Sequence, residues 1–437
     1  MRSNEYDVVV AGGGTAGSVA AIAAAREGAR TLCIEQFGAL GGTTTFGQVT
    51  PVLGHVVGGR RLVLGIHQEI TDRLNAIGMD GIRYDPERLK FVLEELALEA
   101  GVELLYHTFI TGAVVEDGVL RAVEVHNKSG RRVISAGSFV DATGDADLAV
   151  LAGAPHMSGR PEDGLNQSAS LRFTMGGVDF DALAAWLQER GVTVQPPNIA
   201  FGFTRGYHKD HWMNALIDQA EEEGVFAPGE GGYIQFFSVP GRPGELFFNC
   251  PRIMKVNCAR AEDLTYAQIR GRQLILKIVE FCKRYMGGFE KAYIAWTAPM
   301  VGVRETRRII GEYVFSGDDV RTAAKFDDAA ARSAYPIDIH FPDREGVLLQ
   351  SPPPGDFYEI PYRCMVPVRP DGLLVTGRCI SSTFEGQSAM RVVGPVRALG
   401  EAAGVAAAWA ARQNTVPRLL DITALRERWT ELGVLGE

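Results

Sequence analysis

Residues 6–17 read Tyr6-Asp7-Val8-Val9-Val10-Ala11-Gly12-Gly13-Gly14-Thr15-Ala16-Gly17, and this stretch decides the fold. The β-branched run over 6–11 predicts a buried strand. The alanine-rich stretch over 18–28 predicts a helix that ends at a glycine. A second strand is predicted over 30–34 and stops at Glu35. This order of strand, G-x-G-x-x-G, helix, strand and acid is the fingerprint of a dinucleotide-binding unit.

Each part of the fingerprint has a physical role. Gly12 permits a tight turn, Gly14 lets the backbone approach a pyrophosphate, and Gly17 lets the helix pack closely on the strand. The pyrophosphate is expected at the helix N-terminus, where free N–H groups and the helix dipole favour an anion. Glu35 is placed to accept a hydrogen bond from an adenosine ribose hydroxyl, and its charge disfavours the 2′-phosphate of NADP. The residues predicted to contact the nucleotide here are Gly12, Gly14, Thr15, Ala16, Gly17, Glu35 and Gln36.

A loop rich in glycine and threonine follows over residues 36–47. Such a loop brings backbone and hydroxyl groups close to a ligand, so Gly42, Thr43 and Thr44 are predicted to flank the cofactor; an irregular surface loop is the alternative. His55 and His67 come next and are interpreted as structural, although His55 lies where the loop could face a cofactor.

Bulk properties limit the class of protein. A chain of 437 residues predicts two domains or one large domain with an insertion. A net charge of -9 disfavours nucleic acid and anionic membranes as partners. No apolar run is long enough to span a membrane and no signal peptide is evident, so we expect a cytoplasmic location. The six cysteines include no C-x-x-C pair, and no metal site is predicted. The oligomeric state stays open, a homo-oligomer included.

The rest of the first domain is predicted to be α/β. Asp85-Pro86 starts a helix that ends at Gly101, and a strand follows over 102–106. Alternating residues over 109–139 predict a β-meander with tight turns. A strand then leads into Asp141-Ala142-Thr143-Gly144-Asp145.

The glycine fingerprint with Glu35, the meander and the Asp141–Asp145 turn together resemble the FAD-dependent oxidoreductases of the glutathione-reductase-like superfamily. The resemblance implies FAD, with Ala142, Thr143, Gly144 and Asp145 near the pyrophosphate. More distantly the chain is similar to fumarate reductase and succinate dehydrogenase flavoproteins. The stretch over 41–45 lacks the histidine that some of those use for covalent attachment, so non-covalent FAD is expected.

Residues 155–355 differ in character from what precedes them. They hold most of the prolines and aromatics and no second G-x-G-x-x-G, so they are predicted to form an inserted α+β substrate or cap domain. An amphipathic helix is expected over 263–286. The Ser351–Asp356 linker marks the return to the FAD domain, which is predicted to comprise 1–154 and 356–437.

Candidate catalytic residues cluster after residue 298. Arginine binds carboxylates and phosphates through two parallel hydrogen bonds, so Arg304 is the first candidate for an anion site and Arg307 the second; a solvated, salt-bridged edge is the alternative. Strand alternation over 333–340 would place Asp338 and His340 on one face, as in an oriented general base.

The C-terminal segment is predicted to complete the cofactor site. A buried strand over 373–376 leads into Gly377 and Arg378, and residues 382–393 carry Ser388 and Arg391. A helix is predicted from Gly394-Pro395, and the resemblance implies that its N-terminus faces the flavin. Cys379 either lines the flavin pocket or fills the core.

The predicted function is hydride transfer between flavin N5 and a small polar or anionic substrate, with an electron acceptor or donor that the sequence does not identify. Arg304 and Arg391 would orient the substrate, and His340 or Tyr362 would handle a proton. A flavin monooxygenase using NAD(P)H and O2 is one alternative. A non-enzymatic or RNA-modifying flavoprotein is another.

Overall fold

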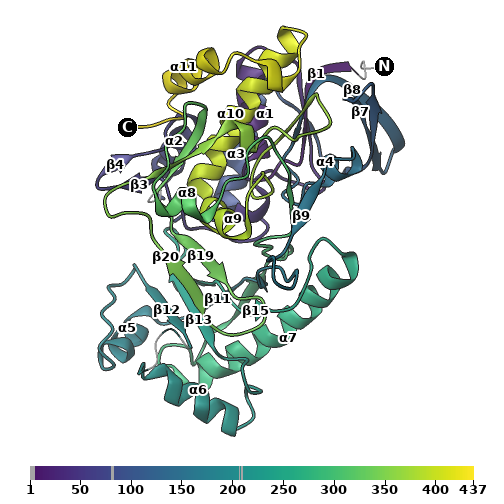
Figure 1. Ribbon diagram of the computed structural model, residues 1–437. Coiled ribbons are helices and arrows are strands. Elements are labelled where there is room, and N and C mark those ends of the chain that lie inside the picture. Colours follow the sequence, from purple (N-terminus) through teal and green to yellow (C-terminus); the bar gives the residue numbers. More distant parts are fainter. Residues whose placement is uncertain (1–4, 80–82, 206, 208–209) are drawn as a thin grey trace.

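The computed structural model describes residues 5–79, 83–205, 207 and 210–437, and a mixed seven-stranded sheet organises it (Figure 1). The strand order is β5-β2-β1-β8-β7-β6, with β22 also beside β8. The pairs among β5, β2, β1, β8 and β22 are parallel, and β6, β7 and β8 form an antiparallel meander. The predicted Rossmann-like sheet with its meander is thus confirmed. Its strands are β1 (Glu5–Ala11), β2 (Thr31–Ile34), β5 (Glu103–Leu105), β6 (Phe109–Glu116), β7 (Val119–Asn127), β8 (Gly130–Asp141) and β22 (Leu373–Val375).

Strand β8 joins the meander to the parallel sheet. Its first half pairs with β7, its last three residues pair with β22, and its opposite edge pairs with β1. Ala11 and Val375 both lie in register with Asp141. The carboxyl ends of three parallel strands therefore meet at one edge of the sheet, where ligands of open α/β sheets bind.

Two small-residue helices pack against each other beside this sheet. They are α1 (Gly17–Arg26) and α10 (Val393–Arg412). A Cβ atom added at Gly400 would lie 2.3 Å from the carbonyl oxygen of Ala16, and one at Gly404 would lie 2.2 Å from that of Ala20. Glycine at these two positions therefore allows the helices to pack closely. Helix α10 begins at Val393, one residue before the predicted start.

Further helices lie outside the second core. They are α2 (Gly65–Ala76), α3 (Pro86–Glu99), α4 (Asp147–Leu151), α8 (Gly317–Arg321), α9 (Phe384–Met390) and α11 (Ile422–Leu432). Asp85 accepts a hydrogen bond from the Glu87 N–H at 2.9 Å and so caps α3 as predicted.

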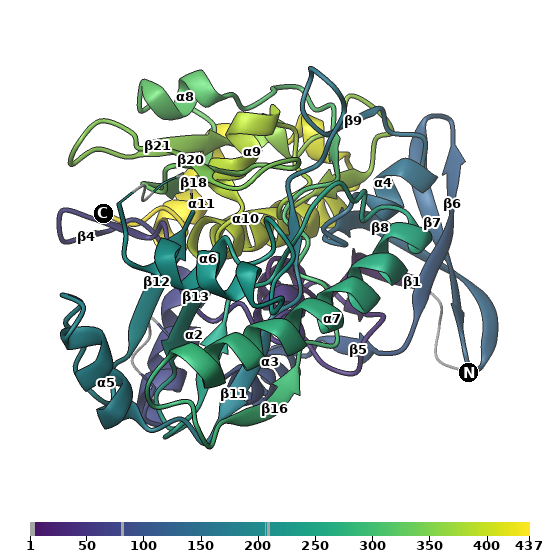
Figure 2. The same cartoon turned by 90° about the horizontal axis from the view of Figure 1, so that it is seen from below.

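The first hydrophobic core packs around the large sheet, α1 and α10. A second hydrophobic core is formed by residues between Ala169 and Val301. It lies between a five-stranded antiparallel sheet, in the order β12-β13-β14-β11-β16, and helices of which α7 is the longest (Figures 1 and 2). The predicted helix over 263–286 is confirmed as α7 (Ala261–Tyr285). The other elements are β11 (Phe173–Gly176), β12 (Ala200–Thr204), β13 (Tyr233–Ser238), β14 (Leu246–Phe248), β16 (Tyr293–Thr297), α5 (Phe180–Gln188) and α6 (Met213–Glu222).

Residues 315–339 contribute side chains to the first core, although the sequence places them within the 155–355 insertion. Among them, β18 (Ala329–Ser333) pairs with β21 (Tyr358–Pro361), and β19 (Ile337–His340) pairs with β20 (Val347–Gln350). The domain boundaries drawn from the sequence stay a prediction. Within the described residues, no helix is both long and apolar enough to cross a membrane.

Candidate active site

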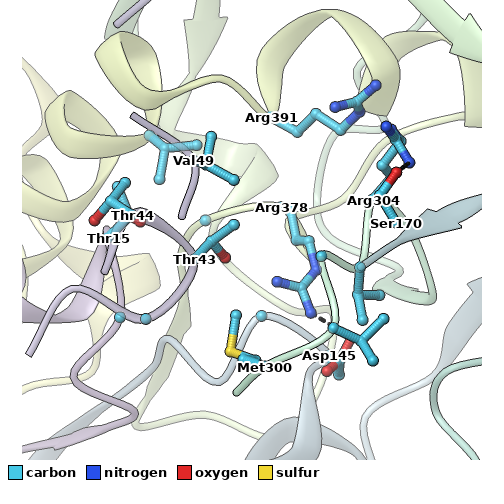
Figure 3. Close-up of a pocket in the computed structure, with 18 of the residues that line it drawn as sticks. Thr15, Thr43, Thr44, Val49, Asp145, Ser170, Met300, Arg304, Arg378 and Arg391 are labelled. Carbon is cyan, nitrogen blue, oxygen red and sulfur yellow. Dashed lines mark hydrogen bonds and ion pairs between the residues drawn. The ribbon is translucent and has the colours of Figure 1, made fainter. Parts of the chain in front are cut away.

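A cavity of about 880 Å³ runs from the carboxyl edge of the large sheet to the second core (Figure 3). Its size is in the range of ligand pockets. It brings together most of the residues predicted to hold the cofactor. These are Gly12, Gly14, Thr15, Ala16, Glu35, Gln36, Gly42, Thr43, Thr44, Ala142, Thr143, Gly144, Asp145, Gly377 and Arg378.

The three fingerprint glycines have distinct environments. Gly12 has a φ of +92°, and an added Cβ would lie 2.7 Å from the carbonyl oxygen of Ala142. At Gly17 an added Cβ would lie 1.8 Å from the Gly12 carbonyl oxygen, so this glycine serves packing and does not line the cavity. At Gly14 the nearest atom would be 3.9 Å away. Helix α1 has no side-chain cap at Ala16. The cradle therefore suits a pyrophosphate at the helix N-terminus.

Glu35 forms the wall beside this cradle. It is 5% exposed and accepts hydrogen bonds from the Gly13 N–H at 2.7 Å and the Phe37 N–H at 2.8 Å. Burial raises the pKa of its carboxyl group, and these backbone hydrogen bonds oppose the rise. The two contacts hold the carboxyl group in one orientation at the cavity wall, with lone pairs left for a ribose hydroxyl.

The Asp141–Asp145 turn also contributes to the cavity lining. Asp141 is fully buried and accepts hydrogen bonds from the Thr143 N–H at 2.9 Å and the Ala149 N–H at 2.8 Å, which hold the turn closed. Arg378 pairs with Asp145 at 2.7 Å (Figure 3). This ion pair ties the loop after β22 to the loop after β8.

Arg304 reaches the other end of the cavity, as its predicted role requires. Its Nη1 donates to the Ser168 carbonyl oxygen at 2.6 Å and to Ser170 Oγ at 2.9 Å. Its Nε and Nη2 make no hydrogen bond with any described residue. These two donors lie on one edge of the planar guanidinium, the edge that binds a carboxylate with two hydrogen bonds. Burial, and next the charge of Arg391, lower the pKa of Arg304 to about 9.

Arg172 is a second arginine in this part of the cavity, and the sequence analysis missed it. Its Nη1 donates to the Gln48 carbonyl oxygen at 3.0 Å, and within the described chain its Nε–Nη2 edge is likewise unpaired. Burial lowers the pKa of Arg172 to about 10. A signal was present: Ser170, Arg172 and Thr174 alternate with apolar neighbours, which marks a polar strand face.

Arg391 completes the cluster of cations. Its Nη2 donates to the Asp338 carbonyl oxygen at 3.0 Å and lies 3.6 Å from Asp338 Oδ2. Asp338 is the acid among these cavity-lining arginines, so Arg172, Arg304 and Arg391 leave an excess of positive charge. An anion is the ligand that this end of the cavity favours.

Asp338 and His340 both line the cavity, as the strand alternation predicted for one face of β19. His340 Nε2 lies 3.3 Å from Asp338 Oδ1, and the Tyr335 hydroxyl donates to Asp338 Oδ2 at 2.9 Å. Burial, with Arg304 nearby, holds the pKa of His340 well below its usual value, so the imidazole is neutral. Burial opposes the charge of Asp338, yet His340 and Arg391 hold its pKa below the ordinary value.

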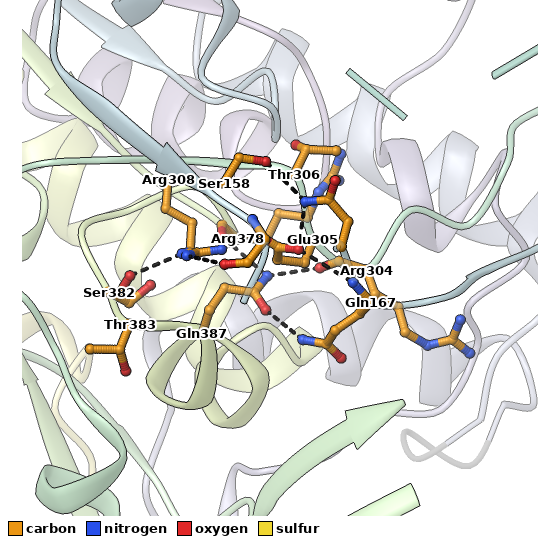
Figure 4. A network of polar contacts seen from close by, with 12 residues as sticks. Ser158, Gln167, Arg304, Glu305, Thr306, Arg308, Arg378, Ser382, Thr383 and Gln387 are labelled. Atoms are coloured by element: carbon orange, nitrogen blue, oxygen red, sulfur yellow. Dashed lines mark hydrogen bonds and ion pairs between the residues drawn. The ribbon is translucent and has the colours of Figure 1, made fainter. Parts of the chain in front are cut away.

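A buried polar network anchors the segment that carries Arg304 (Figure 4). Gln387 Nε2 donates to the Arg304 carbonyl oxygen at 2.7 Å, and Gln167 Nε2 donates to Gln387 Oε1 at 3.1 Å. Arg308 forms an ion pair with Glu305, and both side chains are almost fully buried. The contacts fix the backbone at Arg304 from two sides.

Besides Gly17, further residues singled out from the sequence lie outside the cavity lining. The Tyr362 hydroxyl donates to the Pro417 carbonyl oxygen at 3.1 Å in the core, so the predicted proton-transfer role is corrected. Ser388 faces inward within α9 and donates to the Glu385 carbonyl oxygen at 2.7 Å, which corrects its predicted cofactor contact. Arg307 pairs with Asp147. Cys379 is fully buried and fills the core.

His55 and His67 pack against each other, with ring centroids 5.1 Å apart. Neither is among the residues that line the cavity. Their structural role stays a prediction.

Residues 7–429 match the model of the FAD dependent oxidoreductase family, so the chain belongs to that family and FAD is its cofactor. Dihydrolipoyl dehydrogenase of Trypanosoma brucei brucei is 65% identical over 40 residues, which cover 9% of this chain and 8% of that protein. The mitochondrial dihydrolipoyl dehydrogenase of Pisum sativum is 63% identical over 41 residues, with the same two shares. The chain thus spans less than a tenth of the length of these curated relatives.

Two solved structures resemble the chain over most of its length. A geranylgeranyl bacteriochlorophyll reductase-like protein of Thermoplasma acidophilum has a TM-score of 0.45 and 14% identity, covering 98% of this chain and 83% of that one. The flavin-dependent brominase Bmp2 has a TM-score of 0.47 and 13% identity, with the same coverages.

Proposed function

We propose that this FAD-dependent oxidoreductase transfers a hydride between flavin N5 and a small organic anion held by Arg304, Arg172 and Arg391. FAD, when bound, supplies or accepts the hydride. The observation that carries the proposal is the pair of unpaired guanidinium edges, on Arg304 and Arg172, in one cavity.

The cavity residues support one orientation of the cofactor. Gly12, Gly14 and Glu35 would hold the ADP portion, so the flavin would extend toward Arg391 and Arg304. Thr43, Thr44 and the first turn of α10 would flank it. We propose non-covalent attachment, because the stretch over 41–45 contains no histidine; flavin released into the supernatant on heat denaturation would support this.

The arginines supply both affinity and orientation in this proposal. Each free Nε–Nη2 edge can bind one carboxylate through two parallel hydrogen bonds. Because Arg304 and Arg172 are buried, their interaction with an anion is screened less than at the surface. Two such edges position a substrate more rigidly than one, which favours a fixed geometry for the reacting carbon.

His340 is proposed to take or give the proton that accompanies hydride transfer. Asp338 contacts the ring through Nε2, which leaves Nδ1 as the basic nitrogen. Nδ1 is enclosed and has no hydrogen-bond partner among the described residues, so the ring must turn for this nitrogen to reach the substrate. The low pKa of His340 keeps this nitrogen unprotonated at neutral pH.

The test is anaerobic bleaching of bound FAD by a panel of small carboxylates and their neutral methyl esters. Carboxylates should bleach the wild-type enzyme, whereas the esters should be at least about 100-fold slower, since a charged hydrogen-bond partner is lost. Arg304→Ala and Arg172→Ala should each lose the preference for the carboxylate without losing FAD. Arg260→Ala, which removes an exposed cation of the same domain, is the matched control.

Esters that react as fast as their acids would contradict the anion site. Oxygen uptake driven by NADPH and substrate, without release of hydrogen peroxide, would instead indicate the monooxygenase alternative.

A further inference from the structure

Arg397 is a buried arginine without a carboxylate partner. It lies on α10, is 2% exposed, and makes no ion pair with any described residue. Its Nη1 lies 3.5 Å from His67 Nδ1, and its guanidinium carbon lies 5.8 Å from the centroid of the Tyr84 ring. Its Nη2 is enclosed and has no hydrogen-bond partner.

Two other buried arginines have an evident reason for their charge. Arg308 has Glu305 as its partner, and Arg304 lines the cavity. An isolated buried cation is unfavourable, and a core of hydrophobic residues would be more stable. Arg397 therefore calls for a role other than stability.

The surroundings of Arg397 do not neutralise it. Burial and the charge of Arg397 both lower the pKa values of His55 and His67, so the two imidazoles are neutral. Glu401, one helical turn away, accepts a hydrogen bond from the Ile66 N–H at 2.9 Å. Burial raises the pKa of Glu401 to about 8, so it too is uncharged at neutral pH.

Arg397 stands directly behind one wall of the cavity. Val393 and Val396, in the same two turns of α10, line that wall. The Tyr84 hydroxyl donates to the Val49 carbonyl oxygen at 3.1 Å, and Val49 also lines the cavity. Arg397 thus lies between two chain segments that reach the cavity surface.

This wall lies where the redox ring of FAD is expected. Gly14 and Glu35 define the nucleotide end of the cavity, and Arg304 defines the substrate end. Val393 is two residues from Arg391, which belongs to the substrate end. The ring must lie beside the substrate and away from the adenosine, which places it against this wall.

We propose that Arg397 sets the reduction potential of bound FAD, by holding a fixed positive charge behind the ring that favours its electron-rich, reduced form. Charge near the ring is one of the means by which proteins tune a flavin. The partial positive charge at the N-terminus of α10 also favours the reduced form. The burial that makes Arg397 unfavourable for stability is what keeps its field from being screened by water and salt.

The expected size follows from Coulomb's law. A unit charge on the order of 10 Å from the ring, at an effective dielectric constant of about 20, favours the reduced form about tenfold. For a two-electron couple a tenfold change is about 30 mV.

The experiment measures the midpoint potential of bound FAD by equilibration with a reference dye during slow enzymatic reduction. No substrate is added, so the result does not depend on the proposed substrate class. Arg397→Met should shift the equilibrium about tenfold toward oxidised FAD, whereas Arg397→Lys, which keeps the charge, should stay near wild type. Arg412→Met removes an exposed charge from the same helix and is the matched control, expected to have no effect.

A second measurement separates charge from packing. The apoprotein of Arg397→Met should unfold at the same temperature as wild type or higher, because an unpaired buried charge is replaced by an apolar chain. A structural arginine would give the opposite result. If Arg397→Met does not accumulate as folded protein, Arg397→Gln provides a neutral side chain that keeps hydrogen-bonding capacity.

Two results would overturn the proposal. One is a neutral variant that binds FAD and whose equilibrium between oxidised and reduced FAD stays within about twofold of the wild-type equilibrium. The other is an Arg397→Lys enzyme whose potential falls as far as that of the neutral variant, because the shift would then not follow the charge.

Discussion

At the scale of single residues, burial decides the chemistry of the cavity. Arg304 and Arg172 each use Nη1 to bind protein oxygens and leave the other edge of the guanidinium unpaired. Asp338 is held between His340, Tyr335 and Arg391. These contacts orient the side chains before any ligand arrives, which reduces the entropy lost on binding.

The protonation state of His340 leads to a pH prediction. Burial keeps its pKa well below the ordinary value of about 6.5, so the neutral, basic form persists as the pH falls through that value. We expect kcat to remain on its plateau at pH 6 and to fall only at lower pH. His340→Gln should lower kcat by about 100-fold or more and remove that acid limb.

A pH–rate profile of wild type and His340→Gln makes the check, with FAD content measured for both. A wild-type limb centred at or above pH 6.5 would show that His340 titrates normally. An unchanged limb in the variant would show that another group is responsible.

At the scale of secondary structure, α10 both packs against α1 and lines the cavity. Gly400 and Gly404 allow it to lie against α1, and its first turn lines the cavity. Arg397 and Glu401 occupy its buried side. The position of the helix therefore couples the nucleotide cradle at α1 to the substrate end.

Gly404→Ala tests this helix contact. The added Cβ would lie 2.2 Å from the Ala20 carbonyl oxygen, so α1 and α10 must separate. We expect a loss of about 1–3 kcal/mol in the free energy of unfolding, as for other overpacked cores, and weaker FAD binding. Thermal unfolding and FAD titration of the apoprotein measure the two effects.

Gly202→Ala is the control, because its Cβ would meet the Gln235 side chain at 3.6 Å, an ordinary contact. If Gly404→Ala and Gly202→Ala unfold at the same temperature, α1 and α10 can move apart without a loss of stability.

At the scale of the whole molecule, the cavity exists because two cores meet. The Rossmann-like core supplies the nucleotide cradle, and segments at the edge of the second core supply Arg172 and Arg304. Neither part alone contains both ends of the cavity. Binding at one end is therefore expected to stabilise the contact between the two cores.

Glu401 makes global stability depend on pH. Its folded-state pKa of about 8 lies above the value of about 4.3 for an unfolded chain. Between these values the folded protein binds more protons than the unfolded chain, so stability declines as the pH rises toward 8 and then levels off. Glu401→Gln, which can still accept from the Ile66 N–H, should remove this decline.

The expected gain for Glu401→Gln at pH 8 is about 2 kcal/mol or more, with little change near pH 5. Thermal unfolding at both pH values makes the comparison, and Glu427→Gln, an exposed acid on α11, is the control. A gain of equal size at both pH values would rule out titration of Glu401 as its cause.

The sequence by itself determined the nucleotide end of the protein. Short-range spacing accounts for the positions of Gly12, Gly17 and Glu35, for the meander and for the long helix over 261–285, because turns and helices are set by residues close together in the chain. Arg304 and the Asp338–His340 pair were also predicted, since each comes from one local motif.

The tertiary structure alone decided the rest. Arg172 joins Arg304 and Arg391 from distant segments, Tyr362 and Ser388 turn into the core, and Arg397 has no acidic partner among the described residues. Such outcomes depend on which segments meet across more than a hundred residues, and local periodicity carries no information about that. The proposed substrate end was thus set by long-range packing, and the cofactor end by local sequence.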